Sequence, residues 1–390
     1  MTCDTSPERH NGAAAQPEHG ARRSRTKGLA GVCLMALIGA SACTTNSAPT
    51  TSSTTNRSTA TAAATTNSTF AAQSGDTQAD AAALVTAAYR GTFSAPPSSG
   101  PPAVKGKNVW IISCFQVVDS CALPAKGAAA AAQDLGWKST VVDGQLSSSV
   151  EGAAITQAVG ARADAIVLVG IDCFGVQGPL AAARAAGVTI LGLLAFDCDD
   201  PGLDNPGQPM FDLIPATRFA PTQRDLAILY GRVKAAYAIT ATKGKAVALD
   251  IVSPTTLVLH YISQGFQQQL RTCHTCRLAA TVEFTNEEIL SGQLKDKLTT
   301  ALQQHPDVDT LEVPFDPLFQ LAVTPAVGSR KVLLLGGEGL PANVELVRSH
   351  NQTIALATSH AWIGYAGMDM LNRHWAGEKV DAMQIGRAHV

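Results

Sequence analysis

From Lys107 onward the sequence alternates short apolar runs with helical segments, and this alternation leaves few folds open to the chain. Four apolar runs come first, separated by helical segments, and they occupy 108–115, 138–144, 165–172 and 188–197. Short apolar strands that alternate with helices predict a parallel sheet covered by helices on both faces. The first part of the repeating region is therefore predicted to form a doubly wound α/β lobe.

A loop rich in Pro, Gly and Asp, 198–209, interrupts the pattern, which then begins again. Five further apolar runs alternate with helical segments, at 245–252, 278–284, 309–315, 332–339 and 353–359. We therefore predict an α/β fold of two doubly wound parallel-sheet lobes joined by a hinge. Open α/β sheets bind ligands at the carboxyl ends of their strands, and two such sheets that face each other form a cleft that closes by a hinge motion.

Composition and motifs limit the functions open to such a chain. Of the 390 residues 46% are apolar and 15% are charged, and the formal net charge is −2. Proteins that bind nucleic acid usually carry a basic patch, so we expect no nucleic-acid partner. The sequence contains no G-x-S-x-G, H-E-x-x-H or G-x-x-x-x-G-K-[ST] motif, which are signatures of common catalytic sites. We expect no enzymatic activity, no cofactor and no metal.

The N-terminal 43 residues have the pattern of an export signal. Four basic residues in 21–27 precede an apolar run, Leu29–Ile38, and small residues then lead to Cys43. That order is typical of a secretory signal, and the run is too short to span a bilayer. The stretch GASAC, 39–43, resembles a bacterial lipobox, which implies a lipidated Cys43 and anchoring to the outer face of the cytoplasmic membrane. The alternative is an ordinary cleaved signal with an incidental cysteine.

A segment of Ser, Thr, Ala and Asn follows the signal, from residue 44 to about residue 80. It carries too little apolar surface to offset the entropy that ordering would cost. We therefore predict a disordered tether between the membrane anchor and the folded body.

The body resembles the type I periplasmic solute-binding proteins related to ribose receptors. The resemblance lies in an ordered series of segments over residues 105–384, including AKGAAAAAQDLGWKSTVVDGQ, AITQAVGARADAIVLVGIDC, TNEEILSGQLKDKLTTALQQHPDVDTLEV and TIALATSHAWIGYAGMDML. It implies an extracytoplasmic receptor that captures a small polar solute and delivers it to the permease of an ABC importer. It also implies an N-terminal lobe of 105–212 plus 359–384, and a C-terminal lobe of 213–358.

The last six residues, IGRAHV at 385–390, depart from the family pattern, in which another strand and a third crossing between lobes would follow. The hexapeptide looks like one reading frame through a sequencing adapter, so we expect it to be non-native and the gene to be truncated. The alternative is a genuinely short tail.

Polar residues at predicted strand ends are candidate ligand contacts. Asp172 and Asp197 end consecutive strands and Gln145 follows the second strand, and the resemblance implies ligand contact by the acid at position 172. A carboxylate inside a closed cleft needs a partner, such as neighbouring hydroxyls or a cationic group. The alternative is that strand-end aspartates cap the following helices.

In the second lobe the resemblance places His260 where the family has a ligand-binding Arg. It places five further residues at or beside contact positions: Phe284, Phe315, Asp316, Glu338 and Thr358. A stacking face for a sugar ring is expected from Phe115, Phe174, Phe196 or Trp362, and Gln116 beside Phe115 is a further candidate contact. The alternative is that a given Phe belongs to the core. A sugar, a polyol, a purine-like compound and another polar solute all remain open as the ligand.

Six of the nine cysteines lie in the predicted mature body, because Cys3 and Cys33 fall in the signal and Cys43 is set aside for lipidation. Six cysteines allow 15 pairings. The local pairings are Cys114 with Cys121, Cys173 with Cys198, and Cys273 with Cys276. The Cys173–Cys198 bond would fix two cleft-rim loops and be worth roughly 3 kcal/mol. The CHTC stretch, 273–276, lacks the second ligand pair of a zinc site and any thioredoxin-like context.

Two other non-enzymatic functions are found among proteins of this fold class. A receptor that signals to a membrane partner instead of feeding an importer would have the same sequence features. A transcription regulator would have a similar sensor core, but the export signal and the absence of a helix-turn-helix pattern argue against it.

Overall fold

The computed structural model describes residues 77–91, 97–215, 220–378 and 380. The predicted signal, Cys43, residues 44–76 of the predicted tether and the tail 385–390 lie outside the described residues. One boundary is corrected, because residues 77–80, which we assigned to the tether, form the first turn of helix α1 (Thr77–Arg90). Ala81, Leu84, Val85, Ala87 and Ala88 are buried on this helix, so it belongs to the folded body.

The first lobe is built on a four-stranded parallel sheet with the strand order β2-β1-β3-β4. The strands are β1 (Asn108–Ser113), β2 (Lys138–Asp143), β3 (Ala165–Val169) and β4 (Thr189–Leu193). Every residue of β3 is buried because helices cover both faces of the sheet. Val167 faces the core under α2 (Asp119–Asp134) and α11 (His360–Trp375), and its neighbour Ile166 faces the core under the helices on the other face.

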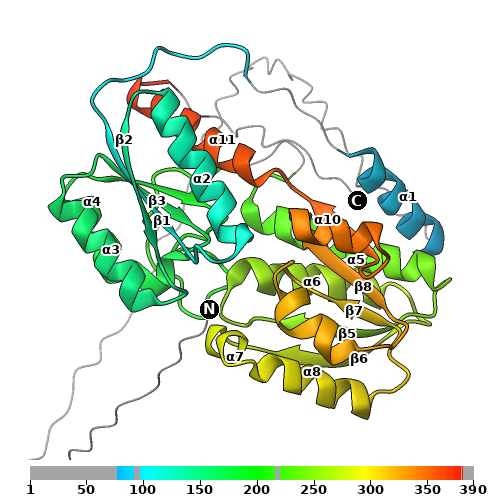
Figure 1. Ribbon diagram of the computed structural model, residues 1–390. Coiled ribbons are helices and arrows are strands. Elements are labelled where there is room, and N and C mark those ends of the chain that lie inside the picture. Colours follow the sequence, from blue (N-terminus) through cyan, green and yellow to red (C-terminus); the bar gives the residue numbers. More distant parts are fainter. Residues whose placement is uncertain (1–76, 92–96, 216–219, 379, 381–390) are drawn as a thin grey trace, which may run out of the picture. The chain divides into compact units, whose positions relative to one another are not determined.

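The helices on that other face are α3 (Ser148–Gly160) and α4 (Gln177–Ala185), and a short turn, η1 (Cys173–Val176), precedes α4. Figure 1 shows α3 and α4 on one side of the first sheet and α2 with α11 on the other. The predicted doubly wound lobe is confirmed, and each of its four predicted strands is present.

The second lobe contains a five-stranded parallel sheet with the order β6-β5-β7-β8-β9. Its strands are β5 (Val247–Val252), β6 (Arg277–Glu283), β7 (Thr310–Glu312), β8 (Leu333–Glu338) and β9 (Ile354–Ala357). Its helices and turns are α5 (Gln223–Ala241), α6 (Leu257–Arg271), α7 (Asn286–Leu290), α8 (Gln293–Gln304), the π-helical turn η2 (Phe319–Val323), α9 (Thr324–Val327) and α10 (Pro341–Arg348). Helix α1 packs against α5, which the sequence analysis did not anticipate.

The chain crosses from the first lobe to the second after β4 and returns after β9, so that α11 packs against α2 in the first lobe. Leu213, which we assigned to the second lobe, bridges to Leu191 of β4 and packs in the first-lobe core. The first lobe therefore extends at least to residue 213.

Glycines bring two pairs of helices into close contact. A Cβ atom on Gly231 of α5 would lie 1.8 Å from the carbonyl oxygen of Ile262, and one on Gly265 of α6 would lie 2.0 Å from that of Ile228. Gly127 of α2 and Gly364 of α11 form the same kind of contact across the first lobe. No larger residue fits at these crossings, because the backbones already touch there.

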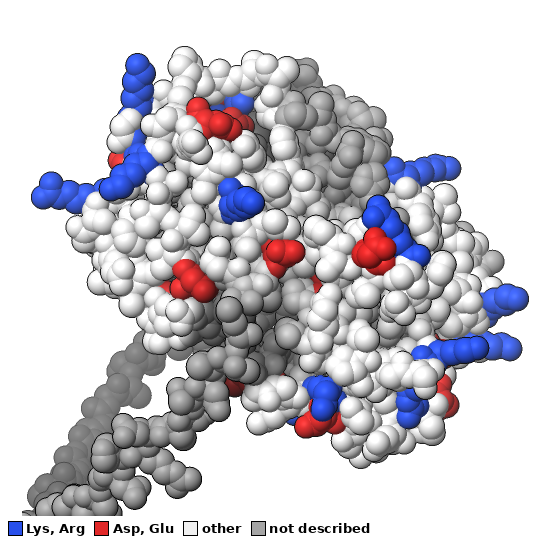
Figure 2. Space-filling view, in the orientation of Figure 1, with Lys and Arg blue, Asp and Glu red and all other residues white. Residues whose placement is uncertain are grey.

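Charged side chains are sparse on the surface. On the face drawn in Figure 2, Lys and Arg side chains stand singly or beside Asp and Glu instead of gathering in one patch. Among the described residues, no helix combines the length and the apolar character needed to cross a membrane.

Candidate functional site

A cavity of about 540 Å³ lies where the carboxyl ends of the strands of the two lobes meet. The first lobe contributes the segments that follow β1, β2, β3 and β4, together with the start of α11. The second lobe contributes residues of α5, the start of α6 and the segments at the ends of β6, β7, β8 and β9. This is the place where open parallel sheets bind ligands, and the volume is in the usual range for small-molecule sites.

Asp172, in the segment between β3 and η1, joins the two lobes. One carboxylate oxygen accepts a hydrogen bond from the backbone N–H of Phe196 at 3.0 Å, and the other accepts from that of Leu257 at 3.1 Å. Leu257 is the first residue of α6 in the second lobe, so Asp172 satisfies a free N–H at that helix end. Burial raises the pKa of Asp172 to about 6, although the two backbone N–H groups act in the opposite direction.

Glu338, the last residue of β8, is a second link between the lobes. It accepts hydrogen bonds from Ser120 Oγ of α2 at 2.8 Å and from the backbone N–H of Asp316 at 3.0 Å. Its other carboxylate oxygen lies 3.6 Å from Nε2 of His360, the first residue of α11. The backbone of Glu338 has φ +86°, a conformation that costs energy for a residue with a side chain and is often found at functional sites.

Two other predicted acids have their oxygens occupied by backbone donors and do not line the cavity. Asp197 accepts from the N–H groups of Cys198, Met210 and Phe211 at 2.7, 2.7 and 3.0 Å. Buried Asp316 accepts from Gly337 and Leu340 at 3.1 and 3.0 Å, and burial, followed by the charge of Glu338, raises its pKa to about 7.

Of the twelve predicted ligand contacts, the cavity brings six together: Phe115, Asp172, Phe284, Phe315, Glu338 and Thr358. The other six do not line it: Gln116, Gln145, Asp197, His260, Asp316 and Trp362. The backbone N–H groups of Gln116 and Gln145 both donate to Asp143 at 3.0 Å, which connects the loops after β1 and β2.

The face that each side chain occupies on its helix explains why His260 and Trp362 do not line the cavity. On α6 the residues that line the cavity are Val258, Leu259 and Ile262, whereas the ring of His260 lies edge-on to Tyr261 at 5.6 Å. Trp362 of α11 packs against the first-lobe core. Of the further stacking candidates, Phe174 lines the cavity, and Phe196 instead contacts Tyr261 at 5.3 Å between ring centroids.

Sequence reasoning missed a group of polar residues that helices bring to the cavity: Glu151, Tyr230, Lys234 and His360. Tyr230 and Lys234 stand four residues apart on α5, so they share one face of the helix. A lone lysine in the mostly apolar segment 226–241 was a signal that could have identified this face. Glu151, in the first turn of α3, is 7% exposed, and burial, followed by the charge of Asp172, raises its pKa to about 7.

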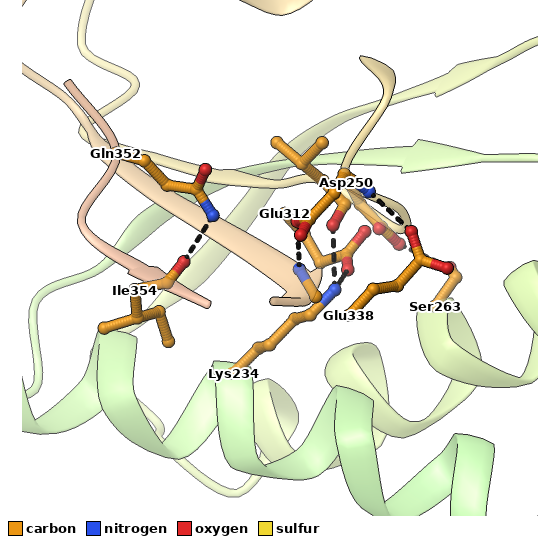
Figure 3. Close-up of polar contacts among 10 residues, drawn as sticks. Lys234, Asp250, Ser263, Glu312, Glu338, Gln352 and Ile354 are labelled. Carbon is orange, nitrogen blue, oxygen red and sulfur yellow. Dashed lines mark hydrogen bonds and ion pairs between the residues drawn. The ribbon is translucent and has the colours of Figure 1, made fainter. Parts of the chain in front are cut away.

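Lys234 is fully buried and forms an ion pair with Glu312 of β7 at 2.7 Å. Its ammonium group also donates to the carbonyl oxygen of Val313 at 2.8 Å. Figure 3 shows Lys234 reaching from its helix to Glu312, with Asp250 close by. Burial raises the pKa of Glu312 to about 8, and the charge of Lys234 opposes that rise. The second lobe thus holds a buried charged group directly beneath the cavity.

The three local cysteine pairings are present as disulfides: Cys114–Cys121, Cys173–Cys198 and Cys273–Cys276. The first lines the cavity, and the second ties the turn after β3 to the loop after β4, next to Asp172 and Asp197. The sulfur atoms of Cys173 and Cys198 lie within 4.8 Å of a carboxylate oxygen of Asp197. Both sulfurs belong to the disulfide, however, and a zinc site would require thiolates.

Several solved structures share this fold. A glucose-galactose binding protein from Geobacillus stearothermophilus has a TM-score of 0.60 at 18% identity, over 73% of this chain and 96% of its own. A solute-binding protein of an ABC transporter from Burkholderia graminis, in complex with D-arabinose, has a TM-score of 0.60 at 18% identity, over 74% of this chain and 95% of its own. A solute-binding protein of an ABC transporter from Agrobacterium vitis, with bound allitol, has a TM-score of 0.59 at 15% identity, over 73% of this chain and 94% of its own.

No curated protein matches the chain. The family model described as a periplasmic binding protein domain matches residues 119–379, which is more than half of the chain. Two doubly wound lobes with a cavity at their strand ends are the architecture expected from the resemblance found in the sequence. The chain therefore belongs to the periplasmic binding protein family.

Proposed function

We propose that the protein is an extracytoplasmic receptor that captures a sugar or a sugar-like solute between its lobes and delivers it to the permease of an ABC importer. The observation that carries this proposal is the cavity itself, which both lobes line with hydrogen-bonding side chains at the carboxyl ends of their strands. A ligand there would touch both lobes at once, so its binding favours the closed arrangement.

The chemistry of the lining supports a polyhydroxy ligand. Glu338 and Asp172 supply carboxylate oxygens, Lys234 and Thr358 supply donors, and Phe115 offers an aromatic face. Neighbouring hydroxyl groups of a sugar can bridge such donors and acceptors, and one ring face can stack on an aromatic side chain. The solved structures with D-arabinose and allitol bind ligands of this class.

We assign ligand contact to the six predicted residues that line the cavity and no catalytic role to any residue. Of the remaining six, Gln116, Gln145, Asp197 and Asp316 take part in hydrogen bonds that connect loops and strand ends, whereas His260 and Trp362 pack against neighbouring side chains. No cofactor is part of this proposal.

Membrane attachment forms the second half of the proposal. Its support is the signal pattern that ends at Cys43, followed by the long polar segment before α1. Radiolabelled palmitate should enter the wild-type protein in its native host and be absent from a Cys43→Ser variant. A Cys33→Ser variant is the matched control, because that cysteine lies in the apolar run of the signal. Equal labelling of the wild-type protein and Cys43→Ser would contradict the anchor.

The binding function is tested by a thermal-shift screen of monosaccharides, polyols, nucleosides and amino acids, followed by calorimetric titration of the best compound. A ligand present at 100 times its Kd stabilises the folded state by about 2.7 kcal/mol, which gives a clear rise in Tm. The Glu338→Gln variant should bind about 10- to 100-fold more weakly, because a hydrogen bond to a charged group is lost.

The control is Glu345→Gln, a change of the same type at a side chain that is 71% exposed on α10. A rise in Tm with nucleosides or amino acids and with no carbohydrate would refute the sugar proposal. Equal affinities of wild type and Glu338→Gln would remove Glu338 from the site.

A further inference from the structure

The rim of the cavity is apolar and exposed. Val117, Leu290, Leu321 and Phe174 line the cavity, and their side chains are 77%, 60%, 47% and 44% exposed. They make up four of the eight large apolar side chains that are exposed among the described residues. Single exposed apolar residues are ordinary, but a gathered set marks a surface that binds something.

The four side chains come from four separate segments and from both lobes. Val117 lies in the turn after β1 and Phe174 in η1, whereas Leu290 ends α7 and Leu321 lies in η2. No single helix or strand has an unpaired apolar face that would explain this set. The fold brings the four together at the mouth of one cavity, which points to the ligand as the molecule that covers them.

Below the rim the walls are apolar as well. About half of the residues that line the cavity are aliphatic or aromatic. The rings of Phe284 and Phe315, from the ends of β6 and β7, lie 6.5 Å apart between centroids with an angle of 30° between their planes. At this spacing the two rings pair with each other, and Phe284 is only 1% exposed, so a flat or alkyl group that enters the cavity would meet a single aromatic wall.

Hydrogen-bonding groups gather beside this apolar wall. Phe315 directly precedes Asp316, whose N–H donates to Glu338. Glu338 in turn faces His360, which is only 5% exposed and whose Nε2 atom has no hydrogen-bond partner among the described residues. Buried polar atoms are rarely left without a partner, so His360 Nε2 is placed to bond a polar group of the ligand. Lys234, whose Nζ lies next to Gly337, completes this polar end.

We propose that the ligand is amphipathic: a polyhydroxy group binds at Glu338, Lys234 and His360, and an alkyl or aryl substituent lies against Phe284, Phe315 and the exposed rim. The compound class is a glycoside, or a similar polyol conjugate, with an apolar group attached. This inference rests on the proposed function, because it takes the same cavity as the solute site. A plain monosaccharide has no apolar group that could cover the rim, whereas an apolar substituent would cover it.

The first test compares pairs of ligands that share one polar group. Glucose, galactose and arabinose are titrated by calorimetry beside their methyl, n-butyl and phenyl glycosides. The phenyl and butyl compounds should bind about tenfold more tightly than the free sugar or better, since each buried methylene changes Kd by about fourfold. Their binding should also show the more negative heat-capacity change that accompanies apolar burial.

The second test uses N-phenyl-1-naphthylamine, an uncharged fluorescent probe without a sugar. We expect saturable binding at one site per protein and at least fivefold weaker binding by a Leu290→Asn variant. Leu278→Asn is the matched control, because Leu278 is also exposed, at 36%, but lies on β6 and does not line the cavity. Both substitutions are at the surface, so both variants should fold.

The outcomes separate this inference from the proposed function. If free sugars bind as tightly as their phenyl glycosides, the inference is overturned and the sugar receptor stands. If the probe binds saturably but neither free sugars nor glycosides bind, the sugar receptor and the glycoside ligand are both refuted, and only an apolar site remains. If neither class binds, both fail. If Leu290→Asn binds the probe and the phenyl glycosides as the wild type does, the rim is not part of the ligand site and the inference is overturned.

Discussion

Replacing Glu151 by Gln should make the protein more stable at neutral and alkaline pH. Glu151 is 7% exposed, and no described residue donates a hydrogen bond to its carboxylate. Its place in the first turn of α3 favours the ionised form, but burial outweighs this effect and raises the pKa from 4.5 to about 7. Gln has nearly the same shape and carries no charge, so the substitution removes the titration and changes the packing little.

The magnitude follows from linkage between folding and protonation. The rise of the Glu151 pKa from 4.5 to about 7 corresponds to about 3 kcal/mol. Because the folded-state pKa lies above the unfolded-state value, the stabilising effect of the proton is fully present below pH 4.5. It is lost as the pH rises through 7. The free energy of unfolding of the wild type should therefore fall by about 3 kcal/mol, relative to Glu151→Gln, between pH 4.5 and pH 8.

Urea denaturation at half-unit steps from pH 4.5 to 8.5 measures this difference directly. The two proteins should be nearly equal in stability at pH 4.5, and the variant should be the more stable of the two at pH 8. Glu345→Gln is the control, because that exposed carboxylate should leave the pH profile unchanged. If the profiles of the wild type and Glu151→Gln run parallel over the whole range, the carboxylate of Glu151 is not desolvated and the reasoning is wrong.

Three further predictions concern other parts of the body. Replacing Cys173 and Cys198 together by Ala should lower the free energy of unfolding by about 3.5 kcal/mol, and the same change at the Cys273–Cys276 pair should lower it by about 1.6 kcal/mol. The difference is expected because the two disulfides close loops of 25 and 3 residues. Urea denaturation measures both losses, and equal losses would argue against the loop-entropy explanation. Lys234→Met should lower the free energy of unfolding by about 3–5 kcal/mol, because Glu312 is then left buried without its partner. The control Lys295→Met changes an exposed lysine and should leave the stability unchanged. An unchanged stability of Lys234→Met would show that the ion pair does not stabilise the fold. Ser120→Ala removes one hydrogen bond between the lobes and should weaken binding of the best sugar by about three- to tenfold, as measured by calorimetry. Ser149→Ala is the control, and an unchanged affinity of Ser120→Ala would refute the prediction.

Much of the fold could be predicted because the signals that define it are local. The strand residues from Ala165 to Val169 read as a buried strand from their composition alone, and they form the fully buried β3. One disulfide had a similar local signal, because Cys173 and Cys198 each follow the end of neighbouring strands, although the sequence left the connectivity of the six cysteines open. Parallel strands that lie side by side bring such positions together whatever the rest of the chain does.

The candidate site was predictable only in part, because a position at a strand end does not fix where its side chain points. Asp172 and Asp197 occupy equivalent positions in the sequence pattern, yet only Asp172 lines the cavity. The loop that follows β4 folds back and places three backbone N–H groups around Asp197. No periodicity in the sequence indicates that this loop folds back onto Asp197.

The sequence by itself determined the two doubly wound lobes and the order of their strands and helices along the chain, and it left the pairing of the six cysteines open. Only the tertiary structure decided that Lys234 pairs with Glu312, that His360 meets Glu338, and that four apolar side chains converge on one rim. Hydrophobic periodicity and turn residues act over a few neighbouring positions. Contacts between residues far apart in the chain depend instead on how the lobes and helices pack, and that packing selects which side chains face the cavity.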